Sequence, residues 1–135
     1  MREILFRGKS ANTGKWIIGD YEHFYLSDGE LVVYISEWGE RSDKVLPETV
    51  GQYTGLTDKN GKKIFEGDIV KVTDDNGETD LCSCGVGYVL FYDGCWYIDE
   101  EVNDGLYDVS KIYYIEVIGN IHDNPELLKG GANDV

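Results

Sequence analysis

Short apolar runs separated by polar turns follow one another along the whole chain. Tyr21–Leu26 and Leu31–Ser36 flank an Asp28-Gly29 pair, and a D-G pair between two apolar-aromatic runs is a strong hairpin signal. We therefore expect these two segments to pair as antiparallel strands. A second pair, Asp93-Gly94, divides the run VGYVLFYDGCWYIDE and predicts a second hairpin in the same way.

The middle of the chain, TVGQYTGLTDKNGKKIFEGDIVKV, is rich in glycine. Turn residues and short apolar runs alternate here, which predicts a turn at Asp58–Gly61, a strand at Lys62–Phe65 and a bend at Gly67-Asp68 leading into Ile69–Val72. A phosphate-binding loop is the alternative, but neither G-x-x-x-x-G-K-[ST] nor G-x-G-x-x-G is present. We interpret the glycines as bends of a small β domain, and expect Asp68 to accept backbone hydrogen bonds rather than act as a base.

The last third predicts one long strand and a short helical turn. VSKIYYIEVIGNI is apolar on both alternate faces, which is typical of a strand in the middle of a core. Asn124, Pro125, Lys129 and Gly130 then stand where a short helix has its cap, first residue, last turn and stop. With six to nine short strands and almost no helix, the chain is predicted to be all-β, most simply a small barrel. We expect a β-hairpin subdomain over residues 1–46 and the barrel over residues 47–135.

The charge of the chain limits which partners it can bind. The net charge is −14, and no Lys or Arg stands between Lys71 and Lys111 although ten acidic residues do. Such a chain repels phosphate backbones, so we expect no direct binding to nucleic acid. The acids can be an ordinary solvated surface. Alternatively they form an acidic face for a basic partner, for which the candidates are Asp74, Asp75, Glu78, Asp80, Glu100 and Glu101.

The sequence predicts a cytoplasmic protein. No apolar run approaches the ~20 residues that a membrane span needs, and MREILFRGKS lacks the apolar region of a secretory signal. The cysteines are odd in number, which fits a reducing compartment better than a disulfide framework.

Metal and catalytic signals are weak. Cys82, Cys84 and Cys95 could join His122 or His23 around a metal, but structural zinc usually needs two C-x₂₋₄-C pairs. The acidic run DDNGETD lacks the calcium-loop spacing, and neither G-x-S-x-G nor H-E-x-x-H occurs. We expect no metal, no cofactor and no catalytic residues.

The aromatic residues are too many for the core of so small a domain. Tyr and Trp are the residues of interface hot spots. Some of them can cap the ends of the barrel; the others are candidates for a partner-binding surface, namely Tyr53, Trp96, Tyr97, Tyr107 and Tyr113.

Three blocks of the sequence are familiar: FRGKS with the following GKW and GD, then VLPETVGQYTGLTDKNGKKIFEGDIV, then IEVIGNIHDNPELL. With these blocks, which cover about half of the chain, the sequence resembles the YopX family of small proteins encoded by bacteriophages and prophages. The resemblance implies an all-β fold whose second part is similar to an SH3-like barrel, and a life in the bacterial cytoplasm. It brings no catalytic residues, and the Cys-x-Cys segment lies outside the matching blocks.

We therefore expect a non-enzymatic protein that binds a host or phage protein, with self-association as a further possibility because sheet edges need covering. One alternative is an acidic nucleic-acid mimic that inhibits a host DNA-binding protein. The other is a small hydrolase or metal-dependent enzyme.

Overall fold

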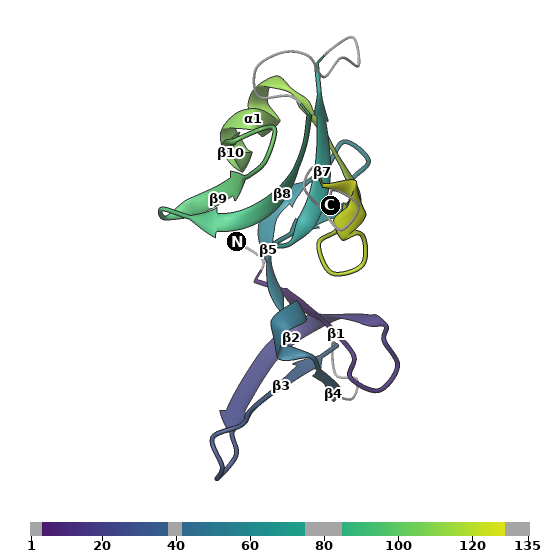
Figure 1. Ribbon diagram of the computed structural model, residues 1–135, viewed down its shortest axis with the longest axis vertical. Coiled ribbons are helices and arrows are strands. Elements are labelled where there is room, and N and C mark those ends of the chain that lie inside the picture. Colours follow the sequence, from purple (N-terminus) through teal and green to yellow (C-terminus); the bar gives the residue numbers. More distant parts are fainter. Residues whose placement is uncertain (1–3, 38–41, 75–84, 129–135) are drawn as a thin grey trace. The chain divides into compact units, whose positions relative to one another are not determined.

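The computed structural model describes residues 4–37, 42–74 and 85–128 (Figure 1). The chain divides into two compact units, Met1–Gly55 and Leu56–Val135. Their boundary falls inside strand β5 (Gly51–Thr57), later in the chain than the expected boundary at residue 46. The fold is all-β, as the sequence predicts, with antiparallel sheets and one short α-helix among the described residues.

The first unit contributes β4, β3, β2, β1 and most of β5 to a six-stranded sheet in the order β4-β3-β2-β1-β5-β6. Ahead of β5, its elements are β1 (Phe6–Lys9), β2 (Trp16–Tyr25), β3 (Leu31–Ser36), β4 (Ser42–Val45) and the 3₁₀ turn η1 (Pro47–Thr49). The expected hairpin is confirmed, because β2 pairs with β3 from Asp20↔Ser36 to Tyr25↔Leu31. Alternate residues of these strands face inward and form a small core of Ile17, Val33, Ile35 and Val45.

The second unit holds a five-stranded sheet in the order β10-β9-β8-β7-β11. Its elements are β6 (Lys63–Phe65), β7 (Asp68–Thr73), β8 (Gly85–Tyr92), β9 (Cys95–Ile98), β10 (Asp104–Gly105), α1 (Leu106–Ile112), β11 (Tyr114–Asn120) and the 3₁₀ turn η2 (Pro125–Leu127). Strand β6 neighbours β5. The core of the unit comprises Ile64, Val70, Val72, Val89, Ile98, Val102, Leu106, Val109 and Ile115.

The predictions around the glycine-rich middle are confirmed. A turn spans Asp58–Gly61, where the Gly61 amide donates to the Asp58 carbonyl, and β6 and β7 follow it. Asp68 is buried, and its Oδ2 accepts the Phe65 amide at 2.8 Å. It thus does the structural work that the sequence predicted, closing the bend between β6 and β7.

The prediction that VSKIYYIEVIGNI forms one long strand in the middle of the core is wrong in two respects. Helix α1 takes the first part of the segment, because Leu106 and Val109, three residues apart, can both reach the core and are almost fully buried. Strand β11 takes the rest but lies at the sheet edge, bonded to β7 alone within the sheet. A register shift between Val117 and Gly119 leaves Ile118 exposed, so apolar residues on both faces do not mean burial on both.

The predicted C-terminal helical turn is present as η2, with Pro125 at its start. Asn124 stands at the cap position as expected, but its side chain makes no cap bond. Its Oδ1 instead accepts the Asn120 amide at 3.2 Å. Lys129 and Gly130 lie outside the described residues. An SH3-like arrangement of the second unit is compatible with these strands and stays a prediction.

Candidate functional site

The β8–β9 hairpin ends in a two-residue turn, Asp93-Gly94, as predicted. Both turn residues have positive φ, 51° and 85°, which is the backbone of the tight turns that match strand twist. Glycine tolerates this conformation without strain and aspartate tolerates it better than most residues. The short turn fixes the register, with Tyr92 opposite Cys95 and Phe91 opposite Trp96.

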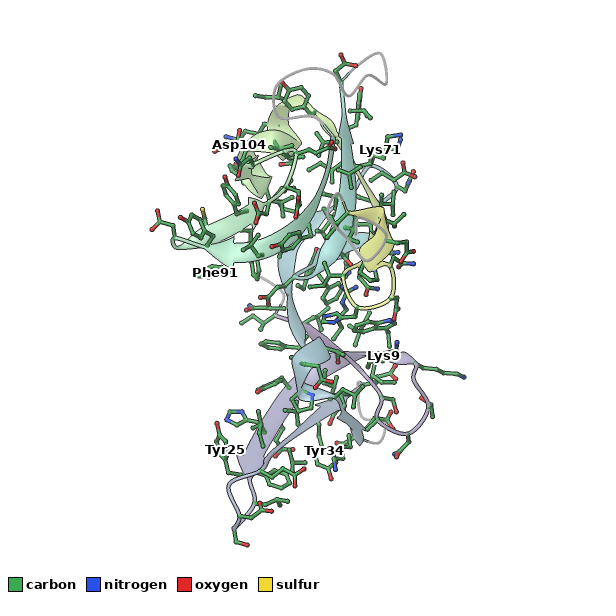
Figure 2. The ribbon with its side chains drawn as sticks, viewed as in Figure 1. Lys9, Tyr25, Tyr34, Lys71, Phe91 and Asp104 are labelled. Atoms are coloured by element: carbon green, nitrogen blue, oxygen red, sulfur yellow. The ribbon has the colours of Figure 1, made fainter. Side chains whose placement is uncertain are left out.

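The core-side face of the hairpin extends beyond the core. Val89 and Ile98 are opposite each other and buried; two residues further along β8, Phe91 has the same orientation but is 57% exposed. Its ring contacts Trp96 edge to face, with centroids 5.2 Å apart, and Trp96 packs against the core. Phe91 therefore lies toward the free end of the hairpin, where its ring contacts Trp96 but is otherwise largely exposed (Figure 2).

The opposite face of the hairpin carries tyrosines. Tyr92, 60% exposed, lies 5.4 Å from Tyr97 between ring centroids. The Tyr97 hydroxyl donates to Asn103 Oδ1 at 2.7 Å, and the Tyr88 hydroxyl donates to Asp99 Oδ2 at 3.2 Å. Aromatic rings whose hydroxyls are already bonded lose little freedom when a partner covers them.

Carboxylates surround these tyrosines. Burial, followed by the charges of Asp99 and Glu100, raises the pKa of Tyr88 above its ordinary 10.0. Burial, followed by Asp99 and Asp104, raises the pKa of Tyr97 in the same direction. Both phenols stay neutral hydrogen-bond donors at physiological pH, and both lie in a negative field.

Two of the five predicted partner-binding residues, Trp96 and Tyr97, are consecutive in β9 and therefore lie on opposite faces of the hairpin. Both are half-buried. Tyr107 is exposed on α1, with Lys111 Nζ 4.4 Å from its ring centroid. Tyr113 follows α1 and packs against the core of the second unit, whereas Tyr53 is buried in the first unit. We omit Tyr53 from the candidate surface because a side chain that is 8% exposed offers little area to a partner.

The predicted acidic face is only partly described. Asp75, Glu78 and Asp80 lie outside the described residues, and Asp74 is half-buried at the end of β7. Glu100 and Glu101 are exposed in the loop after β9. Glu101 has a structural contact as well, since its Oε1 accepts the Val86 amide at 2.9 Å.

Sequence reasoning missed the two most exposed aromatic residues of this hairpin, Phe91 and Tyr92, as binding residues. The available signal was their position directly before Asp93-Gly94, because the last residues of a hairpin often extend past the layer that covers the sheet. It also missed a row of rings on β2, where Tyr21, His23 and Tyr25 alternate along one face. The centroid distances are 5.3 Å from Tyr21 to His23 and 6.0 Å from His23 to Tyr25.

The turn after β5 covers the outer edge of β11. Asp58 Oδ2 accepts the Val117 amide at 2.9 Å, and the Lys59 amide donates to the Ile115 carbonyl at 2.8 Å. Asp58 Oδ1 accepts the amides of Asn60 and Lys62, both at 2.9 Å. One carboxylate therefore closes its own turn and satisfies part of a sheet edge that would otherwise be open to another strand.

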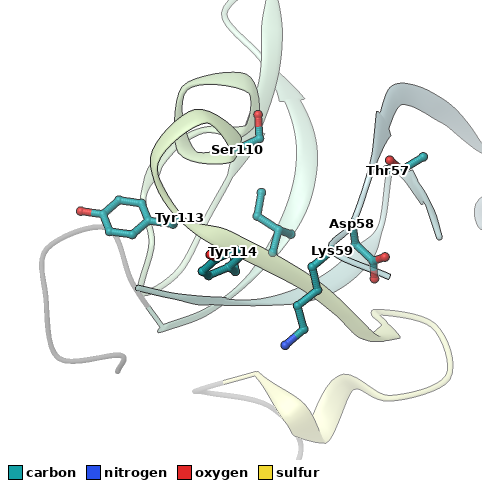
Figure 3. A pocket seen from close by; sticks show the side chains of 7 residues that line it. Thr57, Asp58, Lys59, Ser110, Tyr113 and Tyr114 are labelled. Carbon is teal, nitrogen blue, oxygen red and sulfur yellow. The ribbon is translucent and has the colours of Figure 1, made fainter. Parts of the chain in front are cut away.

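A cavity of about 150 Å³ lies beside this turn, between α1 and β11 (Figure 3). It is lined by Thr57, Asp58, Lys59, Ser110, Tyr113, Tyr114 and Ile115. Burial alone would raise the pKa of Asp58, but the amides of Val117, Lys62 and Asn60 and the charge of Lys62 lower it below the ordinary value of 3.8. An ionised carboxylate with both oxygens bonded to amides is a poor proton acceptor, so the cavity offers no base at this position.

The residues weighed above as metal ligands, where no metal was expected, are described only in part. Cys82 and Cys84 lie outside the described residues. Cys95 is an exposed thiol next to the hairpin turn, His23 belongs to the first unit, and His122 follows β11. Across the described residues, no three His, Cys, Asp or Glu side chains gather closely enough to hold a metal ion. Within the same ranges, no helix is long and apolar enough to cross a membrane.

Comparison with known proteins agrees with the resemblance seen in the sequence. The family model for YopX protein matches residues 5–129. The chain is 40% identical over 128 residues to the SPbeta prophage-derived protein YopX of Bacillus subtilis strain 168, with 83% of this chain and 92% of that protein covered.

Two crystal structures have the same fold. One is protein EF1440 from Enterococcus faecalis, with 26% identity and a TM-score of 0.58. The other is YopX from Bacillus subtilis, with 21% identity in the structural alignment and a TM-score of 0.58. Each alignment covers 96% of this chain and 100% of the other chain. The chain therefore belongs to the YopX family.

Proposed function

We propose that this protein is a prophage-derived, non-enzymatic interaction module that binds another protein through the end of its β8–β9 hairpin. The observation that carries the proposal is Phe91, which is 57% exposed although it lies on the core-side face of the sheet and contacts Trp96. A large apolar side chain held outward by a tight turn is a suitable anchor for a partner.

Partner capture from bacterial lysate tests the proposal with two matched double variants. Phe91→Thr/Tyr92→Thr removes the hairpin aromatics, and β-branched threonine keeps the strand propensity. Phe24→Thr/Tyr25→Thr removes two exposed aromatics from the same position in the β2–β3 hairpin, where Tyr25 lies near the end (Figure 2). A partner held by the wild type and the second variant but lost by the first supports the proposal. A partner held equally by all three proteins, or lost equally by both variants, contradicts it.

Salt concentration separates this function from nucleic-acid mimicry. Exposed charge pairs are screened over about 10 Å at 0.1 M salt, whereas apolar contacts persist. A partner anchored on Phe91 should stay bound at high salt. A DNA-binding partner that is released by salt and insensitive to the hairpin variant would favour the mimic instead.

A further inference from the structure

The outward face of the β8–β9 hairpin is a second surface, distinct from the core-side face of Phe91. We call it the tyrosine face; because strand side chains alternate, it carries the residues between the buried ones. Val89 and Ile98 point to the core. The tyrosine face is therefore made of Tyr88, Leu90, Tyr92, Cys95, Tyr97 and Asp99.

Two of the three rings of the tyrosine face are half-buried and held through their hydroxyls, and the third, Tyr92, is exposed. Two hydroxyls are bonded, Tyr97 to Asn103 and Tyr88 to Asp99. Strand β10 places Gly105 directly opposite Tyr97, and directly opposite residues share a face. Since glycine has no side chain, β10 does not cover the Tyr97 ring.

The charges that act on Tyr88 and Tyr97 are all negative, and the cation on this side of the sheet is on another strand, at Lys71 opposite Val86. Asp99 is part of the face, while Glu100 and Asp104 lie close enough to act on Tyr88 and Tyr97 respectively. The sequence supplies no Lys or Arg anywhere between Lys71 and Lys111. On α1, by contrast, Tyr107 already has the Lys111 ammonium above its ring.

We propose that the tyrosine face binds an arginine-bearing segment of a partner protein. This inference rests on the proposed function and names the chemistry of its partner. A guanidinium stacks on a tyrosine ring and at the same time pairs with a carboxylate through its planar donors. Arginine suits the face better than lysine because its charge is delocalised, weakly hydrated and presented by a flat group.

The direct test is an NMR titration of the purified protein with a short peptide in which three arginines alternate with glycines, beside an otherwise identical lysine peptide. The arginine peptide should bind more tightly, with the shifts centred on Tyr92, Tyr97 and Asp99. Tyr97→Leu should weaken its binding about three- to fivefold, the range expected for one exposed cation–aromatic contact. Tyr97→Phe should retain most of the affinity, because it keeps the ring.

Matched variants separate this site from general attraction to an acidic protein. Glu100→Gln and Glu30→Gln remove the same charge, the first beside the tyrosine face and the second in the β2–β3 turn of the first unit. Only Glu100→Gln should clearly lower the affinity for the arginine peptide. Gly105→Leu should also weaken it, since its backbone (φ −68°, ψ 137°) accepts any residue and the new side chain would cover Tyr97.

Equal affinity for the two peptides, or equal loss with Glu30→Gln, would overturn the inference. Its failure is distinguishable from that of the proposed function. If Phe91→Thr weakens partner capture while Tyr97→Leu leaves it unchanged, the hairpin binds its partner through the core-side face and the tyrosine face is not the site. If Tyr97→Leu weakens capture and Phe91→Thr leaves it unchanged, the tyrosine face is the binding surface and the anchor proposed for Phe91 is wrong.

Discussion

Replacing Asp58 should destabilise the second unit, because its carboxylate connects a turn to a sheet edge. Asp58 is 7% exposed and accepts three backbone amides, those of Asn60, Lys62 and Val117. In Asp58→Asn the size is kept, but one oxygen becomes an NH₂ group. The amide can then accept on one side only, and its donor faces an N–H on the other side.

The expected cost follows from the surroundings of those three amides. A hydrogen bond to a charged group contributes about 1.5–3 kcal/mol. The amides of Asn60 and Lys62 belong to exposed turn residues and can regain water, whereas Val117 is half-buried at the strand edge. We therefore expect Asp58→Asn to lower the free energy of unfolding by about 2–4 kcal/mol, less than the sum of three separate bonds.

The pH dependence provides the sharper signature. Burial of Asp58 would raise its pKa, but the three amides outweigh burial and the folded pKa lies below 3.8. A lowered folded pKa means that the carboxylate stabilises the fold above the unfolded pKa and stops doing so as the pH falls through the folded value. The difference between wild type and Asp58→Asn should be constant above about pH 5 and shrink below about pH 4.

Urea unfolding, followed through amide signals of the second unit at several pH values, measures this difference without mixing the two units. Lys59→Gln is a suitable control, because it removes an exposed ion pair with Glu116 (3.6 Å) but keeps the backbone contact to β11. Its effect should be below about 1 kcal/mol. Equal stability of Asp58→Asn and wild type, or a difference that does not change with pH, would refute the reasoning.

Two further predictions concern single contacts. Thr49→Val should destabilise the first unit by about 1–2 kcal/mol, because the Thr49 hydroxyl accepts a hydrogen bond from the Lys9 amide at 2.9 Å. Thr49→Ser should keep this hydrogen bond and most of the stability. Urea unfolding followed through amide signals of the first unit measures both variants. Gly87→Ala should cost at least about 2 kcal/mol, since a Cβ there would lie 2.0 Å from the Asp99 carbonyl oxygen, and Gly105→Ala, whose Cβ has ordinary contacts, should stay within about 0.5 kcal/mol in the same urea titration.

Local signals predicted the hairpins of this fold well. In the pairs Asp28-Gly29 and Asp93-Gly94 the glycine has a positive φ that few other residues adopt, so the turn and the pairing of its flanking strands could be predicted. Asp68 was predictable for a similar reason, because a short carboxylate at a tight bend has backbone amides within reach.

Helix α1 was not predictable from the same signals. LYDVSKI contains β-branched and aromatic residues and forms only two turns, so its intrinsic propensity points away from helix. Leu106 and Val109 become helical neighbours because the core of the second unit buries them. The edge position of β11 is likewise a tertiary fact, since it depends on which side of β7 is occupied by β8.

The candidate site was predictable in part. Trp96 and Tyr97 were chosen as interface residue types; both lie in the β8–β9 hairpin, on opposite faces of β9, and their role in binding stays a prediction. The exposure of Phe91 was missed, because a phenylalanine two residues after a core valine normally has the same burial, and only its position just before Asp93-Gly94 indicated otherwise. Val89 and Phe91 differ in burial because the core ends between them, and where it ends depends on the packing of α1 and the loops.

The pairing of β7 also sets the order in which the second unit can form. Strand β7 lies between β8 and the edge strand β11, and β11 is the last strand of the described chain. The hydrogen bond from the Val117 amide to Asp58 likewise joins residues that are 59 positions apart in the sequence. During synthesis, β7 emerges with its buried apolar residues Ile69, Val70 and Val72 well before β11 does. The edge of β7 that pairs with β11 therefore stays unpaired until β11 leaves the ribosome. Completion of this sheet is a late step that depends on a contact between distant parts of the chain.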